Sequence, residues 1–176
     1  MITSTANQKI KRILKLQKKA KARNEEGIFI VEGIRMMKEA PESRIKELYI
    51  SETFLQKYPD LPEHLKKKAE MVSDPVFAHM SDTKTPQGIL GVIQRKPWTM
   101  EELLQEENGR APFLMVLDHL QDPGNLGTIL RTAEGAGVTG VILGSNCADL
   151  YQPKVIRSTM GSIYRMRAVC VDDMKE

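Results

Sequence analysis

The stretch from residue 113 to residue 144, FLMVLDHLQDPGNLGTILRTAEGAGVTGVILG, decides the fold class of this chain. It begins at residues 113–118 with an almost wholly apolar run ending in an acid, as expected of a parallel strand buried on both faces. A loop over residues 118–127, a helix over residues 128–137 and a second apolar strand over residues 138–144 follow. This order predicts a βαβ unit, whose crossover we expect to be right-handed.

The loop between these strands carries residue types that suit an anionic ligand. Ligands of open α/β sheets bind at the carboxyl ends of the strands, where this loop lies. Gly124 and Gly127 would let a ligand approach the backbone closely, and Asn125 can cap the helix. Arg131 can lie on the same side as Asn125 and hold a phosphate or a ribose oxygen. The alternative is an ordinary turn, with Arg131 in an internal ion pair.

The spacing of the glycines excludes two common classes of nucleotide-binding protein. It matches neither G-x-G-x-x-G nor a P-loop with its lysine, which argues against a nicotinamide enzyme and a nucleoside triphosphatase. Glu134 follows Arg131 on the same predicted helix and would either pair with it or face a partner subunit. Ser158 and Ser162 would either approach a substrate or pack between helices.

A separate domain is predicted before this region. Over residues 25–95, short strands alternate with short helices, which indicates one small domain of α/β/α layers. Residues 96–112 contain prolines, an Asn-Gly pair and an acidic run, as connectors do. We therefore divide the chain into a domain of residues 1–95, a linker of residues 96–112 and a second domain of residues 113–176. The strands expected in the first domain lie at residues 28–33, 45–51, 70–73 and 89–94.

Positive charge is concentrated at the start of the chain. Residues 1–24 hold eight basic residues and no acid, although the whole chain has a net charge of only +3. Three interpretations stay open: an organelle transit peptide, a solvated helix face, or a surface that binds RNA phosphates by releasing counterions. Residues 5–24 predict one helix, whose apolar stripe would contain Ile10, Ile13, Leu14 and Ala20. The candidate RNA-binding residues are Lys9, Lys11, Arg12, Lys15, Lys18, Lys19 and Arg23.

Composition narrows the class of protein further. No stretch approaches the ~20 apolar residues of a membrane span, so we expect no membrane partner. Two cysteines make neither a disulfide framework nor a metal cluster. We therefore expect no metal site and a reducing compartment, the cytoplasm.

Several motifs together resemble one family. The pattern D-P-x-N-x-G-x-x-x-R-x-A resembles the first motif of the SpoU (TrmH-type) RNA ribose 2′-O-methyltransferases of the SPOUT superfamily. Further segments are similar to the same family: S-x-x-N-x-x-I-K near the N-terminus, FIVEG at residues 29–33, TPQG at residues 85–88, and the S-x-G-[AS] segment within residues 157–162. The residues that form the first motif are Asp122, Pro123, Asn125, Gly127, Arg131 and Ala133.

The resemblance implies a fold and an activity. The fold would be a ribosomal-protein-like α/β/α RNA-binding domain followed by the first half of a SPOUT α/β-knot domain. The activity would be methyl transfer from S-adenosylmethionine to a ribose 2′-hydroxyl of ribosomal RNA, or else of transfer RNA, by a homodimer. Asn125 and Arg131 would be the catalytic residues. Because a guanidinium is always protonated, we expect Arg131 to hold a phosphate of the target nucleotide rather than act as a base.

The sequence also departs from the family. The family's later motifs, G-x-E-x-x-G and S-[LI]-N-[VL]-S, which supply the knot and most of the cofactor pocket, do not occur before Glu176. We therefore expect a truncated, inactive chain that binds S-adenosylmethionine poorly, with its cofactor-binding residues unassigned. We also expect the strand over residues 138–143 to lack neighbours. The competing interpretation is a non-catalytic RNA-binding module, against which Asn125 and Arg131 argue.

Overall fold

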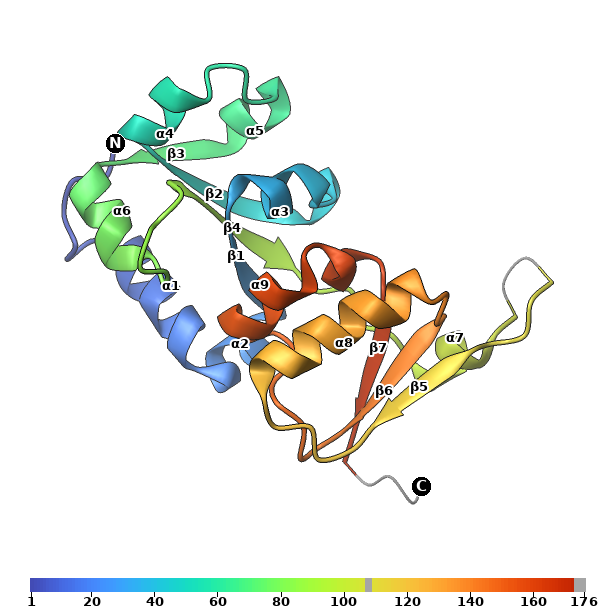
Figure 1. Ribbon diagram of the computed structural model, residues 1–176. Coiled ribbons are helices and arrows are strands. Elements are labelled where there is room, and N and C mark those ends of the chain that lie inside the picture. The colour runs from blue at the N-terminus through green and yellow to red at the C-terminus, as the bar shows by residue number, and fades with distance from the viewer. Residues whose placement is uncertain (107–108, 173–176) are drawn as a thin grey trace. The chain divides into compact units, whose positions relative to one another are not determined.

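Residues 1–106 and 109–172 are described by the computed structural model, in which the chain forms two compact units (Figure 1). The first unit comprises Met1–Arg95 together with Tyr151–Pro153. The second comprises Lys96–Leu150 together with Lys154–Glu176. The division therefore follows Arg95, and the described part of the expected linker, residues 96–106 and 109–112, belongs to the second unit.

The first unit is built on a four-stranded sheet in the order β1-β4-β2-β3. Strand β3 is parallel to β2, and β4 is antiparallel to both β1 and β2. The strands are β1 (Ile28–Glu32), β2 (Ile45–Ser51), β3 (Ala69–Val72) and β4 (Ile89–Gln94), and the helices are α1 (Gln8–Lys18), α2 (Ala20–Glu26), α3 (Ile34–Glu39), α4 (Glu52–Lys57), α5 (Glu63–Lys68) and α6 (Asp74–Met80), with a 3₁₀ turn, η1, at Glu42–Arg44.

Helices cover both faces of this sheet, which confirms the predicted α/β/α layers. Ile28 and Ile30 of β1 join a buried cluster with residues of α1 and α6, among them Ile13. On the opposite face, Met37 of α3 lies against Gly91 of β4, so closely that a Cβ at Gly91 would come within 2.6 Å of the Met37 sulfur. Alternate residues of each strand thus serve the two layers.

The basic N-terminal segment is two helices rather than the single helix predicted. Lys19 adopts an extended conformation, with φ −116°, and separates α1 from α2. Arg23 is only 3% exposed, and its guanidinium donates hydrogen bonds to the carbonyl oxygens of Leu16 (2.5 Å) and Gln17 (3.0 Å). These carbonyls lie at the end of α1, where no intrahelical donor is available. The apolar stripe therefore ends with α1, and Ala20 is exposed.

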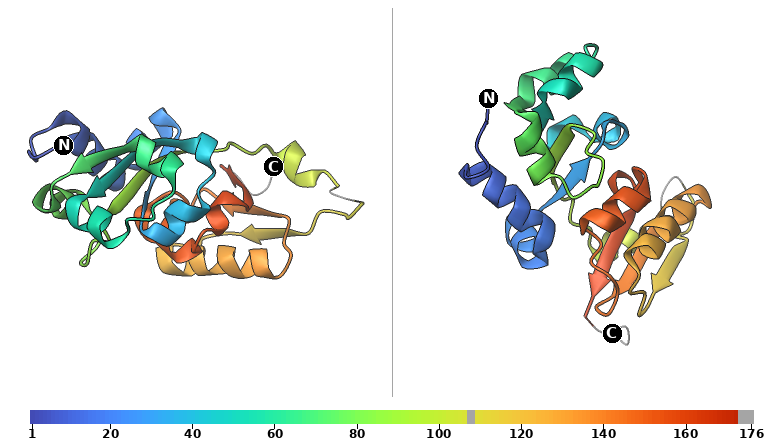
Figure 2. Two further views of the ribbon diagram at one scale, coloured as in Figure 1. Left: turned by 90° about the horizontal axis from the view of Figure 1, so that it is seen from above. Right: turned by 60° about the vertical axis from the view of Figure 1, so that its left-hand side comes forward.

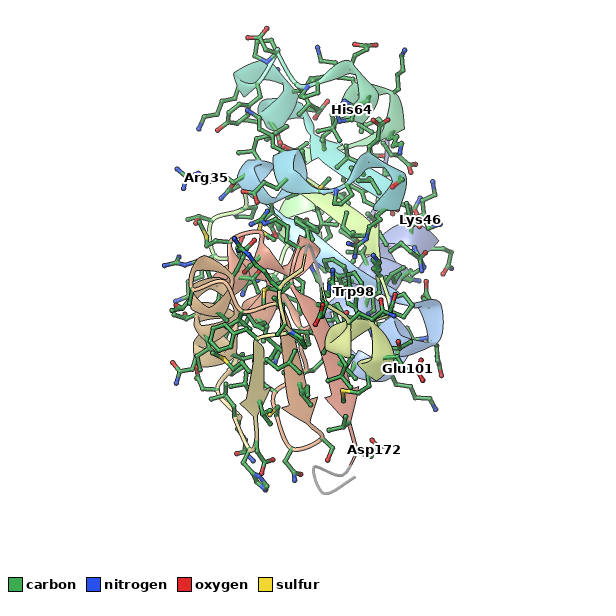
Figure 3. All side chains as sticks on the ribbon, turned by 90° about the vertical axis from the view of Figure 1, so that its right-hand side faces the viewer. Arg35, Lys46, His64, Trp98, Glu101 and Asp172 are labelled. Atoms are coloured by element: carbon green, nitrogen blue, oxygen red, sulfur yellow. The ribbon has the colours of Figure 1, made fainter. Side chains whose placement is uncertain are left out.

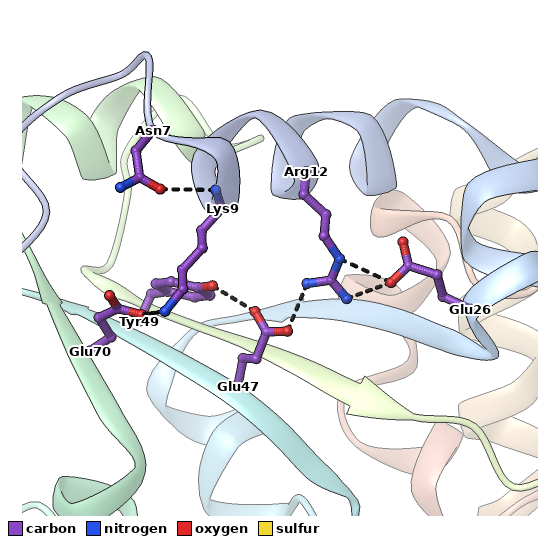
Figure 4. A network of polar contacts seen from close by, with 7 residues as sticks. All are labelled: Asn7, Lys9, Arg12, Glu26, Glu47, Tyr49 and Glu70. Atoms are coloured by element: carbon purple, nitrogen blue, oxygen red, sulfur yellow. Dashed lines mark hydrogen bonds and ion pairs between the residues drawn. The ribbon is translucent and has the colours of Figure 1, made fainter.

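A network of polar contacts fastens α1 to the sheet (Figure 4). Arg12 forms ion pairs with Glu26 (2.5 Å) and Glu47 (2.7 Å), and the Tyr49 hydroxyl donates to Glu47 (2.6 Å). The hydrogen bond to Glu26 raises the pKa of Arg12 above its ordinary value. Burial, and then the hydrogen bond to Glu47, raise the pKa of Tyr49. Because Tyr49 is 1% exposed, its phenol is held in the neutral form by the fold.

Replacing Tyr49 with phenylalanine is expected to change how stability depends on pH. Because the pKa of Tyr49 is raised in the folded state, its contribution to the free energy of unfolding is complete below the unfolded pKa of about 10. This contribution is lost as the pH rises above that value. At neutral pH, Tyr49→Phe should cost about 1 kcal/mol for the lost hydrogen bond. Above about pH 10, its urea midpoint should fall less steeply than that of the unsubstituted chain. Parallel curves would contradict the prediction, and Tyr58→Phe serves as the matched control.

The second unit has a three-stranded parallel sheet in the order β5-β6-β7. Helix α8 covers one face, and α7 lies on the other side of the sheet (Figures 1 and 2). The elements are α7 (Met100–Leu104), β5 (Leu114–Leu117), α8 (Pro123–Gly135), β6 (Gly140–Gly144), α9 (Pro153–Thr159), a 3₁₀ turn, η2 (Ser162–Tyr164), and β7 (Arg167–Val171).

Two expectations for this sheet are wrong. Strand β6, expected to lack neighbours, is the central strand and pairs with both β5 and β7. Strand β5, expected to be buried on both faces, is one of the two edge strands of the sheet formed by the described residues, and Val116 is 58% exposed. Phe113, just before it, is 56% exposed. An apolar run indicates a strand but does not distinguish a central position from an edge.

The described part of the expected linker contains a short helix, α7, and is packed. The ring of Trp98, labelled in Figure 3, contacts two cations: the ammonium of Lys96 lies 3.6 Å and the guanidinium of Arg167 5.2 Å from its centroid. The side chain of Thr99 caps α7, and Leu103 of α7 is 1% exposed. This segment therefore contributes to the core of the second unit.

Candidate active site

Helix α8, which carries both predicted catalytic residues, begins earlier than expected. The loop expected over residues 118–127 ends at Asp122, whose Oδ1 accepts a hydrogen bond from the backbone N–H of Asn125 (2.7 Å). Pro123 takes the first helical position, which its fixed φ favours. Asp122, not Asn125, is therefore the N-cap, and Asn125 lies within the first turn with its side chain exposed.

Asn125 and Arg131 do not lie one above the other on α8. Six residues correspond to about 600° of rotation, so the two side chains leave the helix about 120° apart. Arg131 is exposed, and within the described part of the chain it makes no hydrogen bond or ion pair. Glu134, for which pairing with Arg131 is one of two expectations, forms a two-point ion pair with Arg165. The guanidinium of Arg131 is therefore available to an external anion.

Gly127 serves helix packing rather than ligand approach. A Cβ at this position would come within 2.5 Å of the Ser158 Cβ and 2.6 Å of the Val155 carbonyl oxygen, both on α9. Of the two interpretations offered for Ser158, the structure supports packing, because its hydroxyl donates to the Lys154 carbonyl oxygen (3.0 Å). The absence of a side chain at Gly127 sets the distance between α8 and α9.

Contacts between neighbouring loops hold the segment that precedes α8. The backbone N–H of Ala148 donates to the Leu120 carbonyl oxygen (2.8 Å), and Nδ1 of His119 lies 2.8 Å from the Asp118 carboxylate. His119 has a φ of 54°, unusual for a residue other than glycine. The loops after β5 and β6 thus meet at the carboxyl edge of the sheet and fix the position of Asp122.

The structure divides the candidate RNA-binding residues into two groups. Lys9 is paired with Glu70 (2.5 Å), Arg12 belongs to the network with Glu26 and Glu47, and Arg23 is buried. The remaining four are exposed and have no ion pair or hydrogen bond from their side chains in residues 1–106 and 109–172. They are Lys11, Lys15, Lys18 and Lys19.

Three of these lysines form a stripe along α1. Lys11, Lys15 and Lys18 recur at the spacing of one helix face, opposite the buried Ile13 and Leu16. We call this set the lysine stripe. Its charges face solvent and have no partner within the part of the chain that the structure describes, whereas Lys9 and Arg12 hold the helix to the sheet.

Neither a membrane-spanning helix nor a metal-binding cluster occurs among the described residues. No helix there is both long and apolar enough to cross a membrane. Likewise, no three His, Cys, Asp or Glu side chains of residues 1–106 and 109–172 gather where they could hold a metal ion.

Comparison with protein families matches both units. Residues 7–91 match the MRM3-like substrate binding domain, and residues 112–176 match the SpoU rRNA Methylase family. The second unit thus carries a SpoU methylase domain, and the first an MRM3-like substrate binding domain. The resemblance recognised in the sequence is thereby confirmed, including the match of the first unit to a substrate-binding domain.

Individual SpoU proteins resemble the chain over most of its length. The 23S rRNA (guanosine(2553)-2′-O)-methyltransferase RlmP of Bacillus subtilis is 33% identical over 96% of this chain and 64% of its own length. The human protein rRNA methyltransferase 3, mitochondrial, is 32% identical over 91% of this chain and 39% of its own. The chain therefore spans less than two thirds of the length of these curated relatives.

Solved structures confirm the predicted fold class, including its SPOUT-type second domain. The AdoMet-bound rRNA methyltransferase from Sinorhizobium meliloti has 26% sequence identity and a TM-score of 0.78, over 96% of this chain and 63% of that chain. The SpoU methyltransferase AviRb from Streptomyces viridochromogenes, 21% identical with a TM-score of 0.76, shares the fold.

We assign none of the described residues to a cofactor in this SpoU domain. Gly127 offers no open cradle, because α9 fills the space that a Cβ would take. Asn125 and Arg131 are exposed. The backbone N–H of Asn125, in the first turn of α8, donates to Asp122. These residues suit a polyanionic substrate and do not by themselves enclose an adenosyl group.

Proposed function

We propose that the protein acts as an S-adenosylmethionine-dependent RNA ribose 2′-O-methyltransferase with ribosomal RNA as its substrate. One observation carries the proposal: a SpoU domain presents the unpaired Arg131 on α8, in a chain whose first unit presents the unpaired lysine stripe. The names of the relatives add support, because RlmP and the human protein are rRNA methyltransferases. S-adenosylmethionine would supply the methyl group.

Arg131 and Asn125 have separate roles in this proposal. Arg131 holds a phosphate of the target nucleotide and so orients the ribose 2′-hydroxyl, while the proton leaves to phosphate or water. A guanidinium stays protonated at any physiological pH, which suits binding and excludes action as a base. Asn125, in the first turn of α8, positions the loop beside the substrate. Most of the rate advantage then comes from positioning.

Tritium transfer tests the proposed activity. The chain is incubated with deproteinised ribosomal RNA and S-adenosylmethionine labelled in its methyl group, and the RNA is then treated with alkali. A 2′-O-methyl group blocks alkaline cleavage, so the label should remain in alkali-resistant dinucleotides. RNA binding without incorporation would replace the proposal by the alternative, a non-catalytic RNA-binding module. Failure of the chain to bind RNA would overturn both.

The lysine stripe is expected to contribute much of the affinity for RNA. In the triple variant with Lys11, Lys15 and Lys18 replaced by alanine, the slope of log affinity against log salt should become shallower by about 2 to 3, since each lost phosphate contact removes about 0.7 to 0.9. Fluorescence anisotropy with a labelled RNA stem-loop, recorded at several salt concentrations, measures this slope.

The matched control for the stripe removes three exposed lysines from other helices of the same unit. These are Lys38 of α3 together with Lys66 and Lys67 of α5. An equal reduction of the salt slope in the two triple variants would show that only the net charge matters for RNA binding. That result would contradict a localised RNA-binding surface.

Three further properties implied by the resemblance stay predictions. They are a homodimeric assembly, cytoplasmic location and poor binding of S-adenosylmethionine by the chain alone. The first two are included in the proposal. The expected inactivity of the chain is opposed to the proposal, and incorporation of label in the tritium assay would contradict that expectation. Micromolar binding in a calorimetric titration would contradict the third property.

A further inference from the structure

Helix α9 brings a second cation beside the candidate active site. At Gly127, α8 touches Ser158 of α9, as described above. One turn earlier, the point where a Cβ of Gly124 would lie is 3.9 Å from Cε of Lys154. Because Lys154 faces Gly124 and Ser158 faces Gly127, the two helices run side by side in the same direction. Lys154 therefore lies next to the first turn of α8.

The side chain of Lys154 is not engaged by any ion pair in the described part of the chain. The residue is exposed, and within residues 1–106 and 109–172 its side chain has no hydrogen bond or ion pair. The Asp122 carboxylate lies beside the same point, with its Oδ1 3.1 Å from the position of a Gly124 Cβ, but it accepts from the Asn125 backbone N–H and forms no ion pair with Lys154. Arg12 and Lys9, by contrast, are cations that serve the fold, and each of them forms an ion pair with a glutamate.

The position of Lys154 does not favour helix formation. Lys154 is the second residue of α9, and it lies beside Gly124, the second residue of α8. Helix N-termini carry partial positive charge, so a cation at this place weakens rather than strengthens both helices. A lysine that neither finds a partner nor stabilises its own helix indicates a role toward something outside the fold.

Arg131 lies on the same face of α8 as Gly124, the residue beside Lys154. Seven residues separate Gly124 from Arg131, which corresponds to about 700° of rotation, only about 20° short of two turns, and to a rise of about 10 Å. Two long, unpaired cations are thus arranged along one side of α8. That arrangement suits successive phosphates of a nucleic acid strand better than a single small anion.

We propose that Lys154 is a substrate-positioning residue that contacts an RNA phosphate neighbouring the one held by Arg131. Two such contacts along α8 fix the register of the strand, and hence which ribose is presented at the candidate active site. Contacts of this kind orient the nucleic acid without reading its bases. This inference rests on the proposed function and adds to it a residue from a different helix.

The test measures RNA binding by the 176-residue chain as a function of potassium chloride concentration, with a fluorescein-labelled RNA stem-loop. In Lys154→Ala, the slope of log affinity against log salt should become shallower by about 0.7 to 0.9, the value of one phosphate contact. Lys154→Arg should restore the slope. The matched control is Arg110→Ala, which removes an exposed cation from the same unit and should leave the slope unchanged.

Thermal unfolding separates this role from a structural one. The melting temperature of Lys154→Ala should equal or exceed that of the unsubstituted chain, because a cation is removed from helix N-termini. A lower melting temperature, or a slope that Lys154→Arg does not restore, would assign Lys154 to the fold and overturn the inference. An unchanged slope in a chain that binds RNA would overturn it too, while leaving the proposed function intact. Failure of the unsubstituted chain to bind RNA would instead reject the proposed function.

Discussion

Replacing Arg131 with alanine is expected to reduce methyl transfer to RNA by about 100-fold or more while leaving the fold unchanged. The size follows from the loss of a charged group that stabilises and orients the reacting centre. The fold should persist because Arg131 is exposed and makes no contact that holds α8 within the described part of the chain. Single-turnover tritium transfer to ribosomal RNA measures the rate, and circular dichroism follows the melting curve.

Two variants make this result specific. Arg131→Lys keeps the charge but loses the planar fork of donors, so it should recover only part of the rate. Glu134→Gln, one turn along, disturbs the pair with Arg165 and should affect stability more than rate. Undiminished methylation by Arg131→Ala would show that the activity does not depend on this guanidinium.

Replacing Gly127 with alanine should produce the largest loss of stability among simple substitutions in the second unit. The new methyl group would lie 2.5 Å from the Ser158 Cβ and 2.6 Å from the Val155 carbonyl oxygen. The second of these contacts is backbone and cannot rotate away, so α9 must move. Overpacking of this kind costs about 3 kcal/mol. Urea unfolding monitored by circular dichroism measures the change.

The same helix supplies the control. A Cβ at Gly135, near the end of α8, would meet nothing within 4 Å. Gly135→Ala should therefore stabilise the chain by about 0.5 to 1 kcal/mol through the better helix propensity of alanine. If Gly127→Ala were as stable as Gly135→Ala, the close approach of α8 and α9 described here would be wrong.

Local sequence patterns predict strands well where a short run rich in Ile, Leu, Val and Tyr is bounded by polar residues or turns. Strands β2 and β4 occupy the predicted residues 45–51 and 89–94. Patterns fail where two residues compete for one role. Both Asp122 and Asn125 are good capping residues, and the choice between them depends on Pro123, which favours the first helical position.

Long-range contacts explain what the sequence could not reveal about the candidate site. From the sequence alone, the eight basic residues near the N-terminus cannot be told apart in role. The fold separates them because Glu47, Glu70 and the end of α1 lie within reach of only some of them. In the same way, the glycine spacing suggested ligand approach at Gly127, whereas the position of α9 shows that the space is taken. One signal was present in the sequence, a lysine in the first turn of a helix at Lys154.

The packing of Trp98 against Lys96 and Arg167 gives the second unit an optical label of its own. The chain contains one tryptophan, and its indole is lodged against β7 through Arg167. Selective excitation of that indole therefore yields emission from the second unit alone, with the first unit silent. The two units can then be observed separately in a single chain without attaching a dye.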